Sequence, residues 1–506
     1  MNRRWIGAIV MLLCSSVVNA QNTSELFDFQ ISAFEENIPR GLLLTVPDKQ
    51  TQILFNPARA ALWDKTGFVQ SLSQTSANQP ITLNGLWDNK WLVNVRYFGD
   101  TDNSNSQTMS LRDEIINNVG IPDNTRTERD ETIRELKRAD QQASVQLGSI
   151  KKTGNDRARY RGGYISYSAD DFDNTNTDLD NRTAENYQIV NSSLLLNRRD
   201  TENLFIRNEE NNTYRVTAGV NQSMVRGNKD LIVNLAYQFE RTNDNSILSN
   251  RYMETTQDFI DGMLDGSATM NILSSEQSGV EQNNHSLYGS LFFSNRYGEN
   301  NEHFRYSKIQ TSYGLGFVDV FSRSFDVQNG VNQTTLAPFE QDDRVHQYHV
   351  DIETGYSRIV TGQNYQLQIG GELEVLYRYS ENYTASVLST SAVIDETSMN
   401  DVRVQMVIPA FSSFTILDRL QVWGGANLNL RYTYSETDVH REQVLFSNAE
   451  FISLQGNRRS DTDFTIDRVY YVGLLYQHHS GLRGNIDLGN NLSQLSSWRI
   501  SLAYQF

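Results

Sequence analysis

Cysteine, proline and long apolar runs are scarce in this 506-residue sequence. The single cysteine is Cys14, so the chain beyond residue 20 contains none, which excludes disulfides and thiol chemistry from it. No apolar run after that point approaches 18 residues, which excludes helical membrane spans. A G-x-S-x-G nucleophile motif is absent, and the seven histidines do not have the spacing of a metal site. We therefore expect neither catalytic residues nor a bound metal or cofactor.

The first twenty residues have the pattern of a secretory signal peptide. Arg3 and Arg4 precede an apolar run from Trp5 to Leu13, and small residues follow up to Ala20. This run is too short to cross a membrane, so we expect cleavage after Ala20 and export through the inner membrane. Cleavage changes the formal charge from −17 to −19, because 42 basic residues remain against 61 acidic ones. Such an acidic chain is not expected to bind nucleic acid.

The composition fits two classes of protein. Only 38% of the residues are apolar and the mean hydropathy is −0.53, yet the chain contains 24 tyrosines and 23 phenylalanines. Such a chain is either soluble or a transmembrane β-barrel, in which only alternate residues face lipid. The order of the residues distinguishes the two classes.

Strict alternation of apolar and polar residues recurs along the chain. It is clearest in NYQLQIGGELEVLYRYS, residues 364–380, and it recurs at 231–239, 346–356 and 419–434. The apolar faces tend to end in tyrosine or phenylalanine, as the aromatic girdle of a membrane barrel requires. Strands of 12 to 17 residues are also long for a soluble sandwich. The pattern predicts an all-β fold, a transmembrane antiparallel β-barrel that spans residues 66–506.

Short and long links alternate between these strands. Short ones are expected at 88–90, 151–156, 225–229, 297–303, 360–363, 412–418 and 479–480, and long ones near 100–140, 242–284, 322–343, 381–400 and 437–465. This alternation predicts short periplasmic turns and long extracellular loops around about 18 strands, with 14 and 16 also compatible. The spacing of apolar residues in 130–140 and 251–264 predicts short helices in two loops. The acidic stretch 170–181 is expected to be a solvated loop.

The last nine residues, WRISLAYQF, form another alternating strand. Its apolar face is predicted to hold Trp498, Ile500, Leu502, Tyr504 and Phe506. The ending resembles the C-terminal signal of bacterial outer-membrane proteins, which the barrel-assembly machinery reads. In physical terms the last strand must pair with the first to close the barrel. We therefore expect a Gram-negative outer-membrane location, with outer-membrane lipid and the assembly machinery as partners.

Residues 21–65 precede the first firm strand and are expected to form an N-terminal periplasmic or plug segment. Asn56-Pro57-Ala58, within ILFNPARAALW, resembles the N-P-A motif of the long-chain fatty-acid transporter family. That family has 14-stranded barrels, and the resemblance implies a hatch inside the barrel and hydrophobic substrates that enter from outside. The alternative is that Asn-Pro only starts a turn.

Several charged residues fall on inward faces of the predicted strands. The candidates that face the lumen are His349, Asp351, Glu353, Glu372, Glu374, Arg378, Arg403, Arg419 and Arg431. Opposed carboxylates and guanidinium groups order a polar solute in an open lumen, or they form structural ion pairs in a closed one. A turn near 360–362 predicts that His349 lies opposite Glu372, Gln347 opposite Glu374, and Glu353 opposite Gln368.

Three classes of function remain at the level of the sequence. The first is a channel or uptake protein for small or hydrophobic solutes, and the sequence does not identify the solute. The second is a structural, adhesive or secretion-associated barrel that acts through its extracellular loops. The third, an outer-membrane hydrolase, has the least support because no nucleophile motif accompanies the histidines.

Overall fold

The computed structural model describes residues 40–45, 49–74, 81–116, 124–190, 193–329, 331–335, 339–388, 391–416, 419–445, 450–488 and 498–506. The expected signal peptide, residues 1–20, lies outside the described residues. The described strands are β1 (Phe68–Gln74), β2 (Ile81–Trp87), β3 (Trp91–Ile116), β4 (Asn124–Gly154), β5 (Arg157–Val190), β6 (Ser193–Arg226), β7 (Lys229–Ile260), β8 (Met263–Tyr297), β9 (His303–Gln328), β10 (Val331–Thr335), β11 (Phe339–Thr361), β12 (Tyr365–Leu388), β13 (Ser391–Ile416), β14 (Leu420–Leu445), β15 (Glu450–Gln477), β16 (Leu482–Leu488) and β17 (Trp498–Gln505).

The strands form one closed antiparallel barrel. Apart from β10, each strand pairs with its neighbours in the chain, β9 pairs directly with β11, and β1 pairs with both β2 and β17, so the sheet closes on itself. In the part of the chain that the structure describes, sixteen strands make this ring, and β10 pairs only along β9. The predicted barrel is confirmed. Its 16 described ring strands are one of the numbers compatible with the sequence, in place of the expected 18 or so. Sixteen strands also differ from the 14 that the resemblance to fatty-acid transporters implies.

The last residue completes the seam of the barrel. Seven residue pairs join β1 to β17, from Phe68 with Gln505 to Gln74 with Arg499. Beyond them, the Phe506 carbonyl accepts hydrogen bonds from the backbone N–H groups of Thr66 and Gly67, each at 3.0 Å. The Phe506 N–H donates in turn to the Gly67 carbonyl at 3.1 Å. An intact last strand is therefore what closes the wall.

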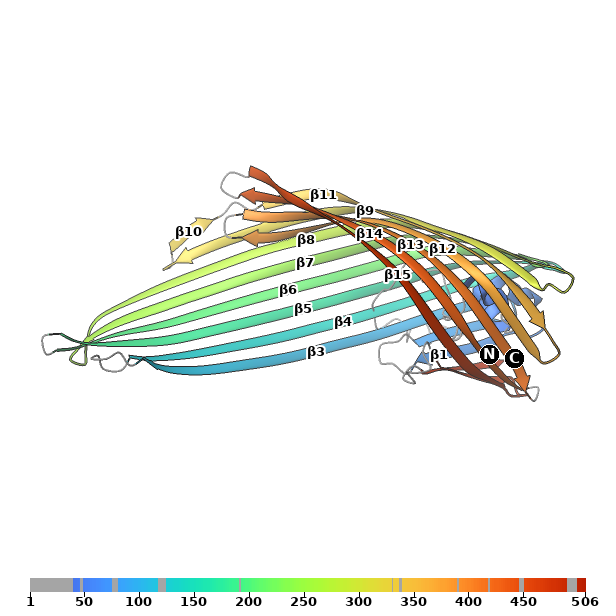
Figure 1. Ribbon diagram of the computed structural model, residues 1–506, viewed down its shortest axis with the longest axis horizontal. Helices are drawn as coiled ribbons and strands as arrows, with labels where there is room; N and C mark the ends of the chain where they lie inside the picture. The colour runs from blue at the N-terminus through green and yellow to red at the C-terminus, as the bar shows by residue number, and fades with distance from the viewer. Residues whose placement is uncertain are drawn as a thin grey trace.

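The expected short turns that the structure describes lie at one end of the barrel (Figure 1), and residues 417–418 of the link expected at 412–418 lie outside the described residues. Tight reversals occupy 88–90, 155–156, 227–228, 298–302, 362–364 and 478–481. Gly227 and Gly481 have positive φ values of 56° and 91°, a backbone conformation that glycine adopts without strain. At this end, the alternation of the sequence located the reversals to within a few residues, although β4 continues to Gly154 and β13 to Ile416, inside links expected at 151–156 and 412–418.

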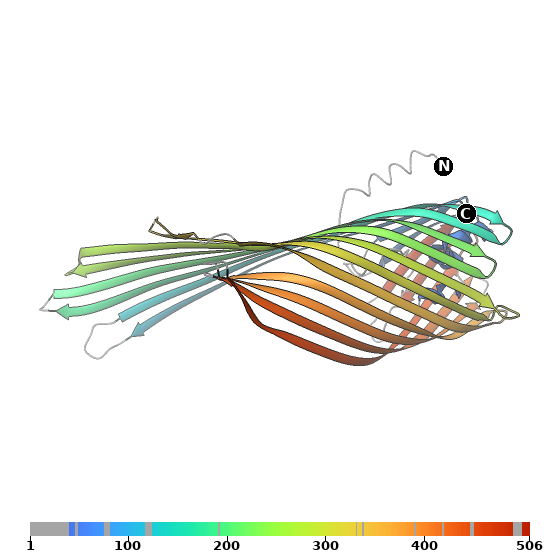
Figure 2. The ribbon, with the colours of Figure 1, turned by 90° about the horizontal axis from the view of Figure 1, so that it is seen from above.

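The other end of the barrel differs from the expectation. Strands β3–β8 are 26 to 35 residues long, whereas β1, β2, β16 and β17 have only 7 or 8. Figures 1 and 2 show these six strands continuing past the barrel as one tapering sheet, which we call the extension. The segments expected to be helical belong to it: 130–140 lies in β4, and 251–264 spans the end of β7 and the start of β8. The acidic stretch 170–181 is part of β5.

The helix prediction fails because neighbouring strands satisfy the backbone of these segments. Residues 130–140 pair along their whole length with β3 on one side and β5 on the other. In the other segment, cross-strand ion pairs add to the pairing of β6 with β7, for example Arg199 with Glu254 at 2.7 Å. Ile133 and Leu136 have helical spacing, but on a strand they point to opposite faces. Long-range pairing overrides the local preference.

The outer surface of the barrel carries an exposed apolar band between two rows of aromatic side chains. The band includes Leu235, Leu291, Ile309, Ile352, Ile369 and Leu373, each 44–60% exposed. Exposed aromatic residues flank it toward the turns (Tyr297, Tyr356, Tyr365, Tyr476, Tyr504) and toward the other end (Tyr237, Tyr313, Tyr348, Tyr377). This is the surface that a transmembrane barrel presents to lipid. No helix among the described residues is long and apolar enough to cross a membrane.

Leu373→Arg is expected to impair membrane assembly, whereas Ser380→Arg on the same strand is not. Leu373 is 44% exposed within the apolar band, where a cation costs about 2–4 kcal/mol. Ser380 lines the lumen, where a cation remains hydrated. The heat-modifiable, membrane-inserted fraction of each variant measures the effect. Equal assembly of the two variants would show that the inward and outward faces are wrongly assigned.

Candidate functional site

The N-terminal segment lies inside the barrel at the end with the short turns (Figure 1). It consists of η2 (Arg40–Thr45), α3 (Lys49–Phe55) and η3 (Pro57–Leu62), which we call the plug. Leu42 and Leu44 are fully buried against aromatic side chains of the barrel: Phe292, Phe304, Tyr306, Phe411, Trp423 and Tyr471. Ile53 and Leu54 pack against the opposite part of the wall: Phe68, Leu86, Leu92, Ile150, Tyr160 and Val225. The plug therefore contacts strands around the ring.

A buried carboxylate of the wall holds the plug. Asp230, at the start of β7, has a fully buried side chain, and Arg59 of the plug grips it with two hydrogen bonds of 2.8 and 2.6 Å. Asn56 adds a third bond to Asp230 at 2.7 Å, and Ser294 of β8 adds a fourth at 3.1 Å. The bidentate geometry is the one in which arginine binds carboxylates most strongly.

The Asn56-Pro57-Ala58 motif organises this contact. The Asn56 side-chain oxygen accepts from the Ala58 N–H at 3.2 Å, and Pro57 occupies the first position of η3, where proline is tolerated. The turn-start interpretation is therefore correct for the local structure. The same asparagine also bonds Asp230, so it joins the turn to the wall.

Further hydrogen bonds attach the plug to other strands. The Thr45 hydroxyl donates to the Gln368 side-chain oxygen on β12 at 2.8 Å, and Gln366 donates to the Thr45 carbonyl at 3.0 Å. Arg296 of β8 donates to the Leu44 carbonyl. Arg483 of β16 donates to the Gln50 side chain at 3.1 Å. These polar contacts supplement the apolar packing on several sides of the barrel.

A layer of charged side chains lies on the inner wall above the plug. Lys308 of β9 lies 3.3 Å from a Glu353 oxygen and 3.8 Å from an Asp351 oxygen, both on β11. Next to them, Arg403 of β13 binds Glu374 of β12, and the Tyr306 hydroxyl donates to Glu372. We call this group the charged layer. The structure brings together four of the carboxylates that the sequence singled out, and it adds Lys308 and Tyr306 to them.

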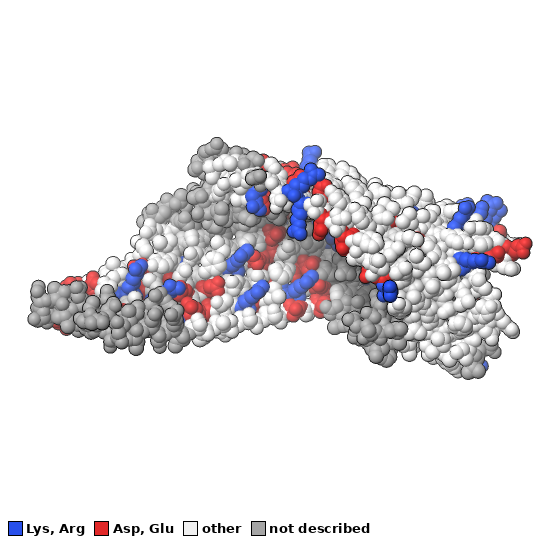
Figure 3. Space-filling model, in the orientation of Figure 1, with Lys and Arg blue, Asp and Glu red and all other residues white. Residues whose placement is uncertain are grey.

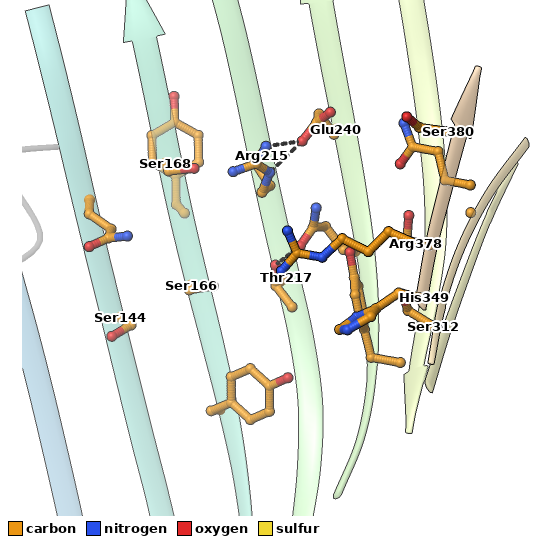
Figure 4. A pocket seen from close by; sticks show the side chains of 18 of the residues that line it. Ser144, Ser166, Ser168, Arg215, Thr217, Glu240, Ser312, His349, Arg378 and Ser380 are labelled. Carbon is orange, nitrogen blue, oxygen red and sulfur yellow. Dashed lines mark hydrogen bonds and ion pairs between the residues drawn. The ribbon is translucent and has the colours of Figure 1, made fainter. Parts of the chain in front are cut away.

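The remaining predicted lumen residues lie in different places. His349 is buried on the inner wall, and Arg378 extends beside it into the lumen (Figure 4). Arg431 faces inward and donates to Gln405 at 3.1 Å. Arg419 lies in the turn before β14, where it is exposed, and is not part of the charged layer.

The expected pairing across the β11–β12 hairpin is wrong by six residues. His349 lies opposite Arg378, Gln347 opposite Ser380, and Glu353 opposite Glu374. The shift arises because the chain reverses at 362–364, with Thr361 opposite Gln366, and not at 360–362. Since the offset is an even number, every residue keeps the face predicted for it. The carboxylate expected opposite His349 is replaced by a guanidinium group.

A cavity of about 480 Å³ opens on the inner wall near His349. Its lining is dominated by hydroxyl and amide groups, contributed by β3–β9 and β11–β13: Asn94, Gln142, Ser144, Gln146, Ser166, Ser168, Thr217, Gln238, Ser286, Ser312, Gln347 and Ser380. Tyr164 and Tyr288 supply aromatic surface. Such a lining provides many hydrogen-bond donors and acceptors at once. It is suited to a small polar molecule.

Charged side chains are unevenly paired in this cavity. Arg215 of β6 forms an ion pair with Glu240 of β7 (Figure 4). Glu240 also accepts from Asn284 at 3.2 Å. Arg378 points toward the centre of the cavity next to His349, and no ion pair joins it to another described residue (Figure 4). The cavity therefore contains a cation available to a solute.

The extension has a hollowed inner face that carries both signs of charge (Figure 3). A second cavity there, of about 430 Å³, is lined by Arg138, Asp170, Phe172, Arg207, Glu209, Asn211 and Asp244, among others. Next to it, Asp140 faces Asp170 across β4 and β5. Burial, and then the neighbouring Asp170, raises the pKa of Asp140 to about 6.

The sheet around Asp140 is expected to become less stable as the pH rises from 4 to 7. A carboxyl group with a raised pKa contributes stability below its ordinary pKa near 4, and this contribution is lost as the pH passes about 6. Hydrogen exchange of β4 and β5 should therefore be slower at pH 5 than at pH 7. Asp140→Asn should remove the difference after correction for intrinsic exchange rates. An unchanged pH dependence in this variant would contradict the assignment.

Some of the residues at the site were not identified from the sequence. Lys308 and Tyr306 belong to the alternating stretch HFRYSKIQTSY, so their inward orientation could have been found from the period. The Arg59–Asp230 pair could not, because 171 residues separate its members. Among the described residues, no group of three or more His, Cys, Asp or Glu side chains is arranged to hold a metal ion.

Comparison with known proteins gives only distant similarities. No family model matches the chain, and no curated protein matches its sequence. Similar solved structures include the ferric-catecholate import receptor Fiu from E. coli K12, at 9% identity and a TM-score of 0.19, with 88% of this chain and 82% of that chain covered. The ferric yersiniabactin uptake receptor FyuA from Yersinia pestis has 7% identity, coverage of 87% and 80%, and a TM-score of 0.21. The copper transporter OprC has 8% identity, coverage of 87% and 80%, and a TM-score of 0.25.

Proposed function

We propose that this chain is a non-enzymatic outer-membrane uptake barrel for small polar solutes, closed in its resting state by the plug. The observation that carries the proposal is the polar cavity of about 480 Å³ in a lumen that contains a firmly held N-terminal segment. Its volume falls in the usual range for small-molecule sites, about 300–1,000 Å³. Serine, threonine, asparagine and glutamine side chains dominate its lining, which favours polar over hydrophobic solutes.

Arg378 is proposed to select anionic or hydroxyl-rich solutes. No ion pair joins it to another described residue, and it lies beside the imidazole of His349 (Figure 4). A guanidinium group binds carboxylate and phosphate oxygens through two parallel hydrogen bonds. The charged layer lies farther along the inner wall, toward the plug, and its ion pairs are proposed to be structural.

Arg378→Gln is expected to shift the ion selectivity of the unplugged barrel toward cations by severalfold. The substitution removes a positive charge from the lumen and keeps hydrogen-bonding capacity. Reversal potentials in planar bilayers, with a salt gradient across the membrane, measure the shift. Arg419→Gln provides a matched control, because Arg419 is exposed in a turn. Selectivity that is the same in both variants would refute the role of Arg378.

The extension supports a second candidate function. Six neighbouring strands continue past the barrel and present a hollow, charged face (Figure 3). An adhesive or secretion-associated barrel would use such a surface to bind a macromolecule. Solute uptake by liposomes that contain the protein distinguishes the two proposals. Solute uptake that changes when residues 40–62 are deleted supports the uptake barrel. No uptake by either the full-length or the plug-deleted protein supports the adhesive or secretion-associated barrel.

A further inference from the structure

A belt of six cations surrounds part of the barrel at the end with the short turns. It consists of Lys151, Arg157, Arg159, Arg161, Arg226 and Lys229, on strands β4–β7, and all six side chains are exposed. Their neighbours in the chain, such as Ile150, Ala158 and Tyr160, are buried toward the plug. Because side chains alternate along a strand, the belt faces outward, toward the membrane.

The belt contains cations directly opposite one another. Lys151 pairs with Arg159 across β4 and β5, and Arg226 lies opposite both Arg157 on β5 and Lys229 on β7. Like charges in directly opposed positions destabilise a sheet. Arg157 lies 3.8 Å from Asp156, and the other five have no ion-pair partner among the described residues. The belt is therefore a concentration of positive charge whose counter-charge the described part of the wall does not supply.

An apolar groove lies beside the belt on the same outer face. It has a volume of about 650 Å³ and is lined by Leu147, Gly163, Ile165, Ala218, Val220 and Leu235, among others. Gly163 and Ala218 leave space between larger exposed neighbours. The groove begins one outward position beyond Arg161, since Gly163 is the next residue of β5 on that face. A molecule that spans both features has an anionic group next to an apolar chain.

We propose that this face is a binding site for an anionic glycerophospholipid of the leaflet on the short-turn side, such as phosphatidylglycerol. The phosphate binds the belt, and an acyl chain occupies the groove. Charge complementarity identifies the headgroup: Lys and Arg near a membrane surface attract anionic lipid, at about 1 kcal/mol each. The inference is independent of the proposed uptake function, because the site lies on the outside of the barrel.

Native mass spectrometry of the full chain in neutral detergent tests the proposal. Added phosphatidylglycerol is expected to remain bound more strongly than phosphatidylcholine with the same acyl chains. A triple variant with Lys151→Gln, Arg159→Gln and Arg161→Gln should bind phosphatidylglycerol roughly a hundredfold more weakly, since three cations are lost. The control is Arg419→Gln, an exposed cation in the turn before β14, on strands away from the belt. It should bind as the unmodified protein does.

A second variant tests the groove separately. A Cβ atom at Gly163 would have ordinary contact with the Gly219 carbonyl, at 3.5 Å, so the backbone accepts a side chain there, and that of Gly163→Leu would extend outward into the groove. It should weaken binding of both lipids, because it fills the groove. Equal binding of the two lipids by the unmodified protein, or retention of phosphatidylglycerol by the triple variant, would overturn the proposal. Stronger binding of purified lipid A would also overturn it, by assigning the phosphate to the other leaflet.

Discussion

Arg59→Met is expected to change the barrel from a closed to a conducting state. Arg59 provides two of the four hydrogen bonds to Asp230, whose side chain is fully buried. Removal of one partner of a buried ion pair leaves an uncompensated charge and costs about 3–5 kcal/mol. That cost would favour release of the plug by a factor of roughly a hundred or more. Single-channel recording in planar bilayers should show discrete openings that the unmodified protein rarely shows.

A double variant separates this electrostatic effect from lost packing. In Arg59→Met with Asp230→Asn the uncompensated carboxylate is removed, while a side-chain oxygen remains to accept from Asn56 and Ser294. The plug is therefore expected to stay in place and conductance to return toward the closed level. Arg419→Gln, in an exposed turn, should leave conductance unchanged. A silent Arg59→Met barrel that is correctly inserted would show that apolar packing alone holds the plug. Conductance of the double variant equal to that of the single variant would contradict the role of the buried charge.

Deletion of Phe506 is expected to reduce the inserted protein at least tenfold. The deletion removes the carbonyl that accepts from Thr66 and Gly67, and the N–H that donates to Gly67. It also removes the Thr66 hydroxyl bond to the same carbonyl, at 2.7 Å. These contacts continue the pairing of β1 and β17 to the edge of the wall, and an open edge in the membrane leaves backbone groups unsatisfied. The heat-modifiable band in outer-membrane fractions measures the effect.

Conservative replacement of the same residue provides the control. Phe506→Tyr keeps the backbone and an aromatic ring, and it should assemble normally, whereas Phe506→Asp should lose the ring and keep the backbone. If recognition by the assembly machinery depends on the ring, Phe506→Asp will resemble the deletion. If closure of the seam is the main requirement, the inserted amount of Phe506→Asp will lie between that of the deletion and that of Phe506→Tyr. Normal insertion after the deletion would refute both roles of the residue.

The strand period and the short turns could be predicted from the sequence. Alternation at residues 364–380 identified which side chains face lipid, and the structure places Leu373 outward and Glu372 inward. The prediction from alternation succeeds because one side of each barrel strand faces lipid and the other faces the lumen. The polarity required at each position then depends on its side of the strand and not on distant residues. The segment WRISLAYQF was predicted to be a barrel strand for the same reason, because it alternates as strongly as any internal strand.

The tertiary structure alone decided the register, the extension and the attachment of the plug. Gly362, Gln363 and Asn364 form the turn of the β11–β12 hairpin, and a sequence with several plausible turn residues does not specify which of them the chain uses. Residues 130–140 have helical spacing but become a strand because β3 and β5 lie on either side. Asp230 and Arg59 meet only after the barrel closes around the plug. Local period fixes the face of a residue, whereas its partners depend on free energies of contact between distant segments, which appear only when the whole chain is folded.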